Sequence, residues 1–184
     1  MFFFYQLTIS LIIIFSPLII IYRIFKNKED QKRFIEKFGF FSKKRKNGKL
    51  VWFHGASVGE LLSIIPLIKN YEKNNSINQI LVTSSTLSSS KVLKKYKLKK
   101  TIHQFYPIDS FLFTNKFLNF WKPNIAIFVD SEIWPCMFKN IKNKNIPLIL
   151  LNARLSNRSF KNWMKIKNFG ETVFDKITVA YPQN

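Results

Sequence analysis

The distribution of apolar and polar positions predicts alternating strands and helices from about residue 50 onward. Short, nearly continuous apolar runs are typical of buried strands, and they occur at 50–53, 79–83, 103–106, 125–129, 147–151 and 176–180. Between them lie segments with helical spacing of apolar residues, at 60–71, 88–96, 111–121, a stretch ending near 143, and 160–169. Such strands, separated by helices, indicate a parallel sheet covered on both faces. The predicted fold class is therefore α/β, with a Rossmann-like sheet.

The first 25 residues differ from the rest because they form one long, mostly apolar run that is not divided into strands and helices. Met1 to Tyr22 includes no charged side chain. As a helix this stretch is about 33 Å long, enough to cross a bilayer core of about 30 Å. We therefore predict a membrane-anchor helix over residues 1–25. Pro17 could kink it, and a helix lying in the membrane interface remains an alternative.

A cluster of basic side chains follows the apolar run directly: Arg23, Lys26, Lys28, Lys32 and Arg33. The positive-inside rule then places the rest of the chain in the cytoplasm, with these cations near anionic lipid head groups. The sequence RFIEKFGFF at 33–41 predicts an amphipathic helix ending at Gly39, and 42–49 is a basic linker. We expect this segment to occupy 26–49 and the folded domain to occupy 50–184.

Charge and cysteine content limit the classes of function. The chain has 30 Lys and Arg against 10 Asp and Glu, a net charge of +20. This excess favours an anionic partner, but it does not distinguish a membrane, a nucleic acid or a phosphorylated substrate. The single cysteine, Cys136, excludes an internal disulfide, and two histidines are too few for a zinc cluster. No metal site is predicted.

The stretch VWFHGASVGE, residues 51–60, predicts a strand, a turn and the first turn of a helix. Gly55 and Gly59 are expected to permit an unusual backbone turn. Helix N-terminal N–H groups at the end of a strand can hold anions and sugar hydroxyls, and Glu60 lies at the rim of this position. The alternative is structural, because Ser57 to Glu60 fits the S-x-x-E capping box.

In a doubly wound sheet, residues that follow different strands converge on one edge. The polar side chains expected there are His54, Ser57, Glu60, Thr83, Ser84, Ser85, Thr86, Asp109, Asp130, Ser131, Glu132, Asn152, Arg154, Ser156 and Arg158. Ordinary caps and turns explain part of this set, because loops at strand ends are commonly polar.

Two motifs on this edge carry opposite charges. In DSEIWP, Asp130 and Glu132 flank Ser131, and this acid pair is a weak indication of a divalent metal. Alternatively, Glu132 is the N-cap of the next helix. In NARLSNRS, Arg154 and Arg158 stand four residues apart. Their guanidinium groups could bind a ligand carboxylate or phosphate, or could pair with the two acids.

The aromatic segment at 111–121 raises the alternative of a nucleic-acid binder. Its phenylalanines and Trp121 lie near basic residues, as in base-stacking surfaces. Core packing of an amphipathic helix explains the same pattern, and no RNA-recognition or helix-turn-helix signature is present. We expect no nucleic-acid partner.

Five motifs in order resemble the N-terminal half of 3-deoxy-D-manno-octulosonic acid (Kdo) transferases: WFHGASVGE, TSSTLSSS, YPIDS, DSEIWP and NARLSNRS. The resemblance implies a two-Rossmann (GT-B) glycosyltransferase that inverts configuration and needs neither metal nor cofactor. It further implies transfer of Kdo from CMP-Kdo to a lipid A precursor, on the cytoplasmic face of the bacterial inner membrane.

The resemblance also implies roles for individual residues. Glu60 corresponds to the general base, which takes the proton of the acceptor hydroxyl. Asp130 corresponds to a position that stabilises the transition state, where glutamate is usual and aspartate is one methylene shorter. Ser57, Glu132, Asn152, Arg154 and Ser156 would line the acceptor side of the cleft.

In GT-B enzymes a second domain carries most of the nucleotide-sugar site. The 184 residues correspond to the acceptor-side domain, so we expect the chain alone to be catalytically incomplete. The rival hypothesis is a membrane-tethered module of the same fold that binds lipid or an anion without chemistry.

Overall fold

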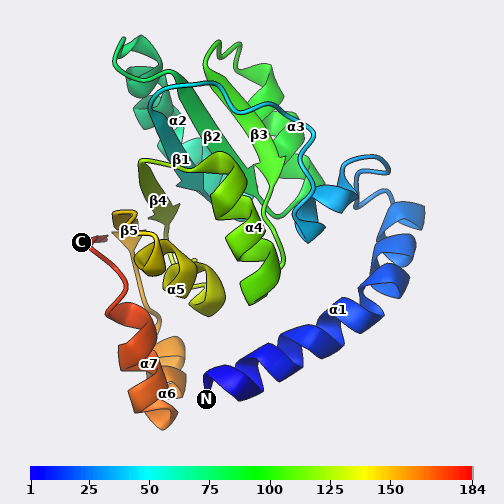
Figure 1. Ribbon diagram of the computed structural model, residues 1–184, viewed down its shortest axis with the longest axis vertical. Coiled ribbons are helices and arrows are strands. Elements are labelled where there is room, and N and C mark those ends of the chain that lie inside the picture. Colours follow the sequence, from blue (N-terminus) through cyan, green and yellow to red (C-terminus); the bar gives the residue numbers. More distant parts are fainter. Residues whose placement is uncertain (184) are drawn as a thin grey trace.

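The computed structural model describes residues 1–183, and it confirms the α/β fold (Figure 1). Six parallel strands form one sheet in the order β3-β2-β1-β4-β5-β6. The strands are β1 (Leu50–His54), β2 (Gln79–Ser84), β3 (Thr101–Phe105), β4 (Ile125–Val129), β5 (Leu148–Ala153) and β6 (Val179–Pro182). This order is that of a doubly wound Rossmann sheet: successive strands are added toward one edge from β1 to β3 and toward the opposite edge from β4 to β6.

Helices cover both faces of the sheet, as the continuous apolar strands predict. On one face, α2 (Val58–Lys73) and α3 (Leu87–Lys95) pack on Val51 and Phe53. On the other, Leu50 and Trp52 contact a cluster built by α4 (Phe111–Trp121), α5 (Pro135–Asn143) and α7 (Lys167–Phe174). Successive residues of β1 therefore serve two separate cores, which is why every residue of this strand is buried.

Element boundaries differ from the prediction mainly at the C-terminal end. The helix predicted over 160–169 is two helices, α6 (Asn157–Lys165) and α7, separated at Ile166. Strand β5 continues to Ala153, so Asn152 lies inside the strand and not after it. The helix at 111–121 and the strand at 125–129 have the predicted bounds.

The glycines after β1 do not produce the unusual turn that was predicted. Among the described residues, only Gly39 and Gly48 are glycines with positive φ. Gly55 serves close packing instead, because a Cβ at this position would lie 3.1 Å from Cβ of Glu60. Left-handed backbone occurs at other strand ends, at Asp130 (φ 58°) and Asn152 (φ 54°).

The N-terminal helix α1 (Phe2–Phe25) is long and apolar enough to cross a membrane by length and composition, with Pro17 inside it. Only 11% of its most apolar window is buried. A buried core helix or a signal sequence can pass the same test of length and composition, so α1 is a candidate anchor. Its N-terminal end lies beside α7, and its other end lies near the segment that follows.

That segment contains η1 (Phe34–Phe38), a 3₁₀ helix that is shorter than the predicted amphipathic helix and ends, as predicted, at Gly39 (φ 73°). Glu36 within it is fully buried and accepts a hydrogen bond from the backbone N–H of Phe105 at 2.8 Å. The backbone N–H of Ile108 donates to the carbonyl of Lys37 at 2.8 Å. The segment therefore packs on the outer side of β3.

Candidate functional site

The predicted site residues follow three neighbouring strands of the sheet. Strands β1, β4 and β5 are adjacent and parallel, so their carboxyl ends open on the same edge, here called the carboxyl edge. Ser57 and Glu60 follow β1, and Asp130 and Glu132 follow β4. Asn152 lies near the end of β5, and Arg154 and Ser156 follow it. The topology brings these residues to one edge.

Glu60 is held at the N-terminus of α2 by two donors. Its Oε2 accepts from the backbone N–H of Ala56 at 2.8 Å, and its Oε1 accepts from the Ser57 hydroxyl at 2.7 Å. Ser57 is the N-cap, and its Oγ in turn accepts from the Glu60 N–H at 3.3 Å. The predicted capping arrangement is thus present with one difference: the carboxylate accepts from the N–H of Ala56, the residue before the N-cap, and not from the N–H of Ser57.

The capping contacts do not occupy all the hydrogen-bond acceptor sites of the Glu60 carboxylate. An ionised carboxylate has about four lone-pair sites, and these contacts use two of them. The side chain is half-buried, and no cation within residues 1–183 pairs with it. These two contacts orient Glu60, and its carboxylate can still accept a hydrogen bond from another donor.

Glu132 is connected to the end of β1 through His54. Its Oε2 lies 3.2 Å from Nε2 of His54 and accepts from Nε1 of Trp134 at 2.8 Å. The fully buried imidazole contacts the Thr83 hydroxyl through Nδ1 at 2.9 Å. Glu132 is not the N-cap of α5, because Trp134 occupies that position without a side-chain cap.

Asp130 and Asn152 form a pair across β4 and β5. The Asn152 amide donates to Oδ1 of Asp130, and the Ser131 hydroxyl donates to the carbonyl of Arg154 at 2.8 Å. Both members of the pair have the left-handed backbone, which non-glycine residues adopt rarely and which asparagine and aspartate tolerate best. The ends of two neighbouring strands therefore carry a polar, solvent-accessible pair on left-handed backbone.

Arg154 is exposed next to this pair. Asp130, Ser131 and Arg154 line a cavity of about 200 Å³, with apolar walls from Leu150 and Phe174. Within residues 1–183 neither Arg154 nor Arg158 forms an ion pair, so the alternative of a structural bridge to Asp130 or Glu132 is wrong. Ser156 is the N-cap of α6 and accepts from the N–H of Ser159 at 3.1 Å.

Asp109, which we expected at this edge, is buried inside the domain. It is 1% exposed, and its oxygens accept from the N–H groups of Cys136 at 3.0 Å and Met137 at 2.8 Å. It is therefore the residue that caps α5, in place of Glu132. Burial raises the pKa of the Asp109 carboxyl, against the opposite effect of its hydrogen bonds.

A buried charged cluster beside β3 was not foreseen from the sequence. We call Arg33, Glu36, Ser84 and His103 the β3 network. Arg33 donates to both Glu36 oxygens, at 2.8 and 2.9 Å, and to Nδ1 of His103 at 3.0 Å. Because a guanidinium only donates, Nδ1 must accept, so the ring is neutral with its proton on Nε2, 2.8 Å from Ser84 Oγ. Burial, and then Arg33, lower the pKa of His103 to about 3.

Among the residues described, no three His, Cys, Asp or Glu side chains are grouped closely enough to hold a metal ion. The residues at the carboxyl edge provide carboxylates, hydroxyls, an amide and arginines. Such groups are suited to binding a polyhydroxylated or anionic ligand and to moving a proton.

Comparison with known proteins gives the same family as the motifs. The family model described as 3-deoxy-D-manno-octulosonic-acid transferase (kdotransferase) matches residues 32–184. The chain belongs to the Kdo transferase family. The match fits the N-terminal domain of these glycosyltransferases, and it includes the β3 network and the whole carboxyl edge.

Individual Kdo transferases agree with this assignment. The 3-deoxy-D-manno-octulosonic acid transferase of Rickettsia bellii is 40% identical over 181 residues, which cover 98% of this chain and 43% of that protein. The enzyme of the same name from Haemophilus influenzae is 29% identical over 179 residues, 95% of this chain and 42% of its own length. The chain thus spans less than half the length of these Kdo transferases.

Proposed function

We propose that the chain is the acceptor-side half of an inverting Kdo transferase that moves Kdo from CMP-Kdo to a lipid A precursor in lipopolysaccharide biosynthesis. The observation that carries the proposal is the Glu60 carboxylate, which is fixed at the carboxyl edge by Ala56 and Ser57 with accepting capacity left. Membership of the family supports the transfer reaction, and the proposed substrates follow the resemblance of the five motifs.

Glu60 acts as the general base in this proposal. One of its oxygens takes the proton of an acceptor sugar hydroxyl while that hydroxyl oxygen forms a bond to the anomeric carbon of Kdo. The bond between the anomeric carbon and the CMP phosphate oxygen breaks, and CMP leaves with the bonding electrons. A carboxylate held by two hydrogen bonds loses little freedom when the acceptor arrives, which favours a productive orientation.

Asp130 is assigned to stabilise the transition state from the neighbouring strand. The bond from the Asn152 amide directs its carboxylate, and the shorter aspartate side chain stands on a left-handed backbone. Arg154 and Ser156 would bind anionic or hydroxyl groups of the acceptor, and Ser57 and Glu132 would complete the acceptor side of the cleft. No metal or cofactor is required in this scheme, and CMP-Kdo is the donor substrate.

We further propose that the protein works at the cytoplasmic face of the bacterial inner membrane. The apolar helix α1 and the basic side chains after it support this location. A net charge of +20 would attract the protein to anionic lipids and to the phosphate groups of a lipid A precursor.

The decisive experiment joins this chain to the remaining, donor-side part of the Rickettsia bellii relative and measures Kdo transfer. We expect transfer by the joined protein, loss of transfer in its Glu60→Ala variant, and no sustained turnover by the chain alone. If the joined protein folds and binds CMP-Kdo, and the Glu60→Ala variant transfers Kdo at an undiminished rate, the role of Glu60 is refuted. Turnover by the 184-residue chain alone would refute its dependence on a second domain.

The second candidate is a membrane-tethered module that binds lipid or an anion without chemistry. It is favoured by the local use of Glu60 as a cap, which a purely structural carboxylate would show as well. In this case the joined protein would bind vesicles but transfer no Kdo.

A further inference from the structure

Helix α1 contacts the folded domain near its N-terminus and the 26–49 segment at its other end. Near the N-terminus, the Phe2 ring packs edge-on against Phe169 of α7, with the ring centroids 5.0 Å apart. The Tyr5 hydroxyl donates to Oδ2 of Asp109 at 2.7 Å. At the other end, Nε of Arg23 lies 3.1 Å from Oε2 of Glu29. The helix therefore runs along the domain and does not project from it (Figure 1).

These attachments reach the core of the domain. Asp109 is the buried carboxylate that caps α5, so Tyr5 is bonded to the residue that organises this helix. The ammonium group of Lys139, on α5, lies 4.9 Å from the centroid of the Phe2 ring. Glu29, at the opposite end, is 4% exposed and also contacts Lys37.

A helix that crossed a bilayer would break the N-terminal attachments. Its first residues would reach the far side, about 30 Å of hydrocarbon away from a domain on the near side. Tyr5 would then lose Asp109, and Phe2 would lose Phe169 and Lys139.

The structure instead divides α1 into two faces. An inward stripe at helical spacing has Tyr5, Ile9, Ile13, Ser16 and Ile20 as less exposed members. The outward side exposes large apolar side chains along the full length of the helix: Phe4, Leu7, Leu11, Ile14, Phe15, Leu18, Ile21, Tyr22 and Phe25. Exposing this apolar surface to water along a helix of about 36 Å is unfavourable in free energy.

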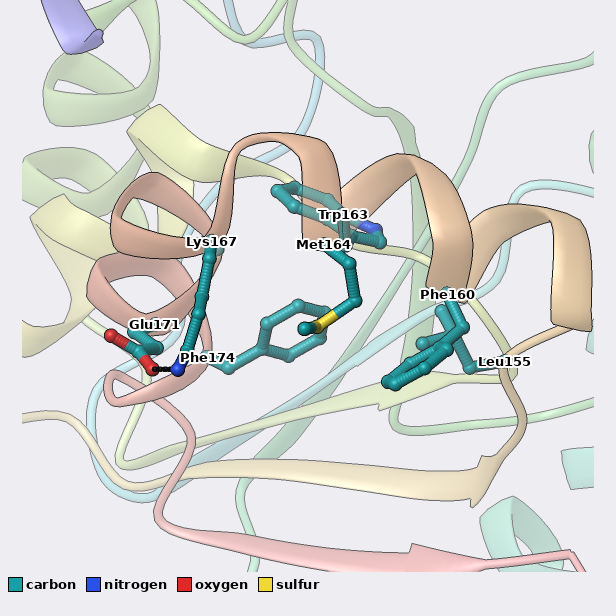
Figure 2. Close-up of a pocket in the computed structure, with 8 residues that line it drawn as sticks. Leu155, Phe160, Trp163, Met164, Lys167, Glu171 and Phe174 are labelled. Atoms are coloured by element: carbon teal, nitrogen blue, oxygen red, sulfur yellow. Dashed lines mark ion pairs between the residues drawn. The ribbon is translucent and has the colours of Figure 1, made fainter.

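A second apolar surface adjoins the N-terminal end of α1. Figure 2 shows the side chains of Phe160, Met164 and Phe174 around a groove between α6 and α7, which has a volume of about 300 Å³. Phe160 is 53% exposed and Met164 is 48% exposed. Trp163 of α6 and Phe2 of α1 both pack on Phe169, so the groove and the helix are continuous.

Basic side chains accompany this groove. Helix α6 carries Arg158, Lys161 and Lys165 but no acid, whereas Lys167 of α7 is paired with Glu171 at the rim of the groove. Apolar side chains next to several cations are the combination by which amphipathic helices bind at the boundary of an anionic bilayer. The charge thus favours a lipid surface over an apolar partner without charge.

We propose that α1 lies in the plane of one leaflet of an anionic bilayer, and that the α6–α7 groove enters the same leaflet beside it. The occupant of both surfaces is the acyl layer below the head groups, and the chain attaches from one side without crossing. The proposal rests on the membrane association proposed above, but not on the transfer reaction.

The first test locates the N-terminal end of α1 in vesicles of phosphatidylglycerol. The native Cys136 is a weak background for thiol chemistry, because burial raises its pKa to about 12. A Phe2→Cys/Lys139→Cys variant is treated with a bismaleimide much shorter than the ~30 Å hydrocarbon layer. We expect an intramolecular crosslink both in detergent and on vesicles, detected by peptide mass mapping.

The matched control is Phe25→Cys/Lys139→Cys, which moves one thiol to the other end of α1 and should give no crosslink. A Phe2–Lys139 crosslink that forms in detergent and disappears on vesicles would mean that the helix crosses the bilayer. Absence of the crosslink in both conditions would show that α1 is not docked. Either outcome overturns the proposal.

The second test asks whether the groove enters lipid. A polarity-sensitive dye is attached at Phe160→Cys in α6, and the control dye is attached at Leu62→Cys in α2, whose native side chain is 42% exposed. We expect phosphatidylglycerol vesicles to shift the emission to the blue at position 160 only, and phosphatidylcholine vesicles to have a smaller effect.

An equal shift at both positions, or no shift at 160 while the protein sediments with vesicles, would refute the groove as a membrane contact. Failure to sediment with vesicles would refute membrane association itself. Neither test uses CMP-Kdo or an acceptor, so a failure here is distinguishable from failure of the transfer proposal.

Discussion

Glu36 and Glu60 are two glutamates that receive hydrogen bonds from nearby backbone and side chains, yet they have opposite surroundings. Glu36 is fully buried and accepts four bonds, from two nitrogens of Arg33, from the Ser42 hydroxyl and from the N–H of Phe105. Glu60 is half-buried and accepts two bonds, one from Ala56 and one from Ser57. No arginine or lysine among the described residues neutralises it.

The difference indicates how each carboxylate is used. The four bonds to Glu36 fill the lone-pair sites of its carboxylate, and the Arg33 charge balances it, so it can stabilise the fold but cannot accept a substrate proton. Glu60 is held in place but is not saturated, as a general base must be. The β3 network is thus structural, and the carboxyl edge has the free accepting capacity that the proposed chemistry needs.

The largest expected effect is on activity at the carboxyl edge. In the chain joined to a donor-side domain, Glu60→Gln keeps the size of the side chain but removes its basicity. We expect the rate of Kdo transfer to fall about 10²- to 10⁴-fold, the usual contribution of a general base. Initial-rate kinetics would measure this loss.

Ser110→Ala is the capping control for Glu60→Gln, because it removes the N-cap of α4, a helix that contributes no residue to the carboxyl edge. It should lower stability by about 1 kcal/mol and leave the rate of Kdo transfer nearly unchanged. A similar rate loss in both variants would indicate that loss of a helix cap, and not of a base, lowers the rate.

The next effect is on stability at the β3 network. Glu36→Gln leaves the partly buried guanidinium of Arg33 without its counter-charge, and we expect a loss of about 3 kcal/mol in the free energy of unfolding. Urea denaturation in mild detergent would measure it. The comparison is Glu171→Gln, which removes an exposed ion pair whose Lys167 Nζ and Glu171 Oε1 atoms are 3.7 Å apart. Its cost should be below about 0.5 kcal/mol, and similar costs for both glutamates would contradict a structural role for Glu36.

The pH dependence of stability tests the same network through His103, whose pKa is lowered to about 3 in the fold from an ordinary 6.5. Between these values the unfolded chain binds a proton that the folded chain does not. The free energy of unfolding should therefore decrease as the pH falls below 6.5, by at most about 1.4 kcal/mol per pH unit. A His103→Gln variant should show a flatter profile. A wild-type profile as flat as that of the variant would exclude a neutral, buried His103.

The smallest expected effect concerns the left-handed backbone at Asn152 in β5. Alanine is disfavoured at φ 54° and cannot donate to Asp130, so Asn152→Ala should cost about 1 kcal/mol of stability. Asn152→Gly relieves the backbone but also loses the hydrogen bond, and should cost less. Thermal unfolding would compare the two variants, and an identical cost would show that the hydrogen bond, not the backbone, determines the effect.

Much of the fold could be predicted from local patterns. Apolar runs located every strand within a few residues, since a strand buried on both faces must be apolar throughout. Parallel topology then placed the residues after β1, β4 and β5 on one edge. The predictions that were wrong depended on short distances: Glu132 was one candidate for the cap of α5, but Asp109 caps it, and Gly55 gives room to Glu60 but no unusual turn.

The sequence by itself determined the order of strands and helices, the candidate acids at their ends and the family, because these follow from periodicity and from motifs that are local in the chain. Only the tertiary structure decided which acids are saturated and how α1 lies. Arg33 contacts His103 across 70 residues and Tyr5 contacts Asp109 across 104 residues. A hydrogen bond forms or fails within a few tenths of an ångström, and no pattern along the chain specifies such a distance.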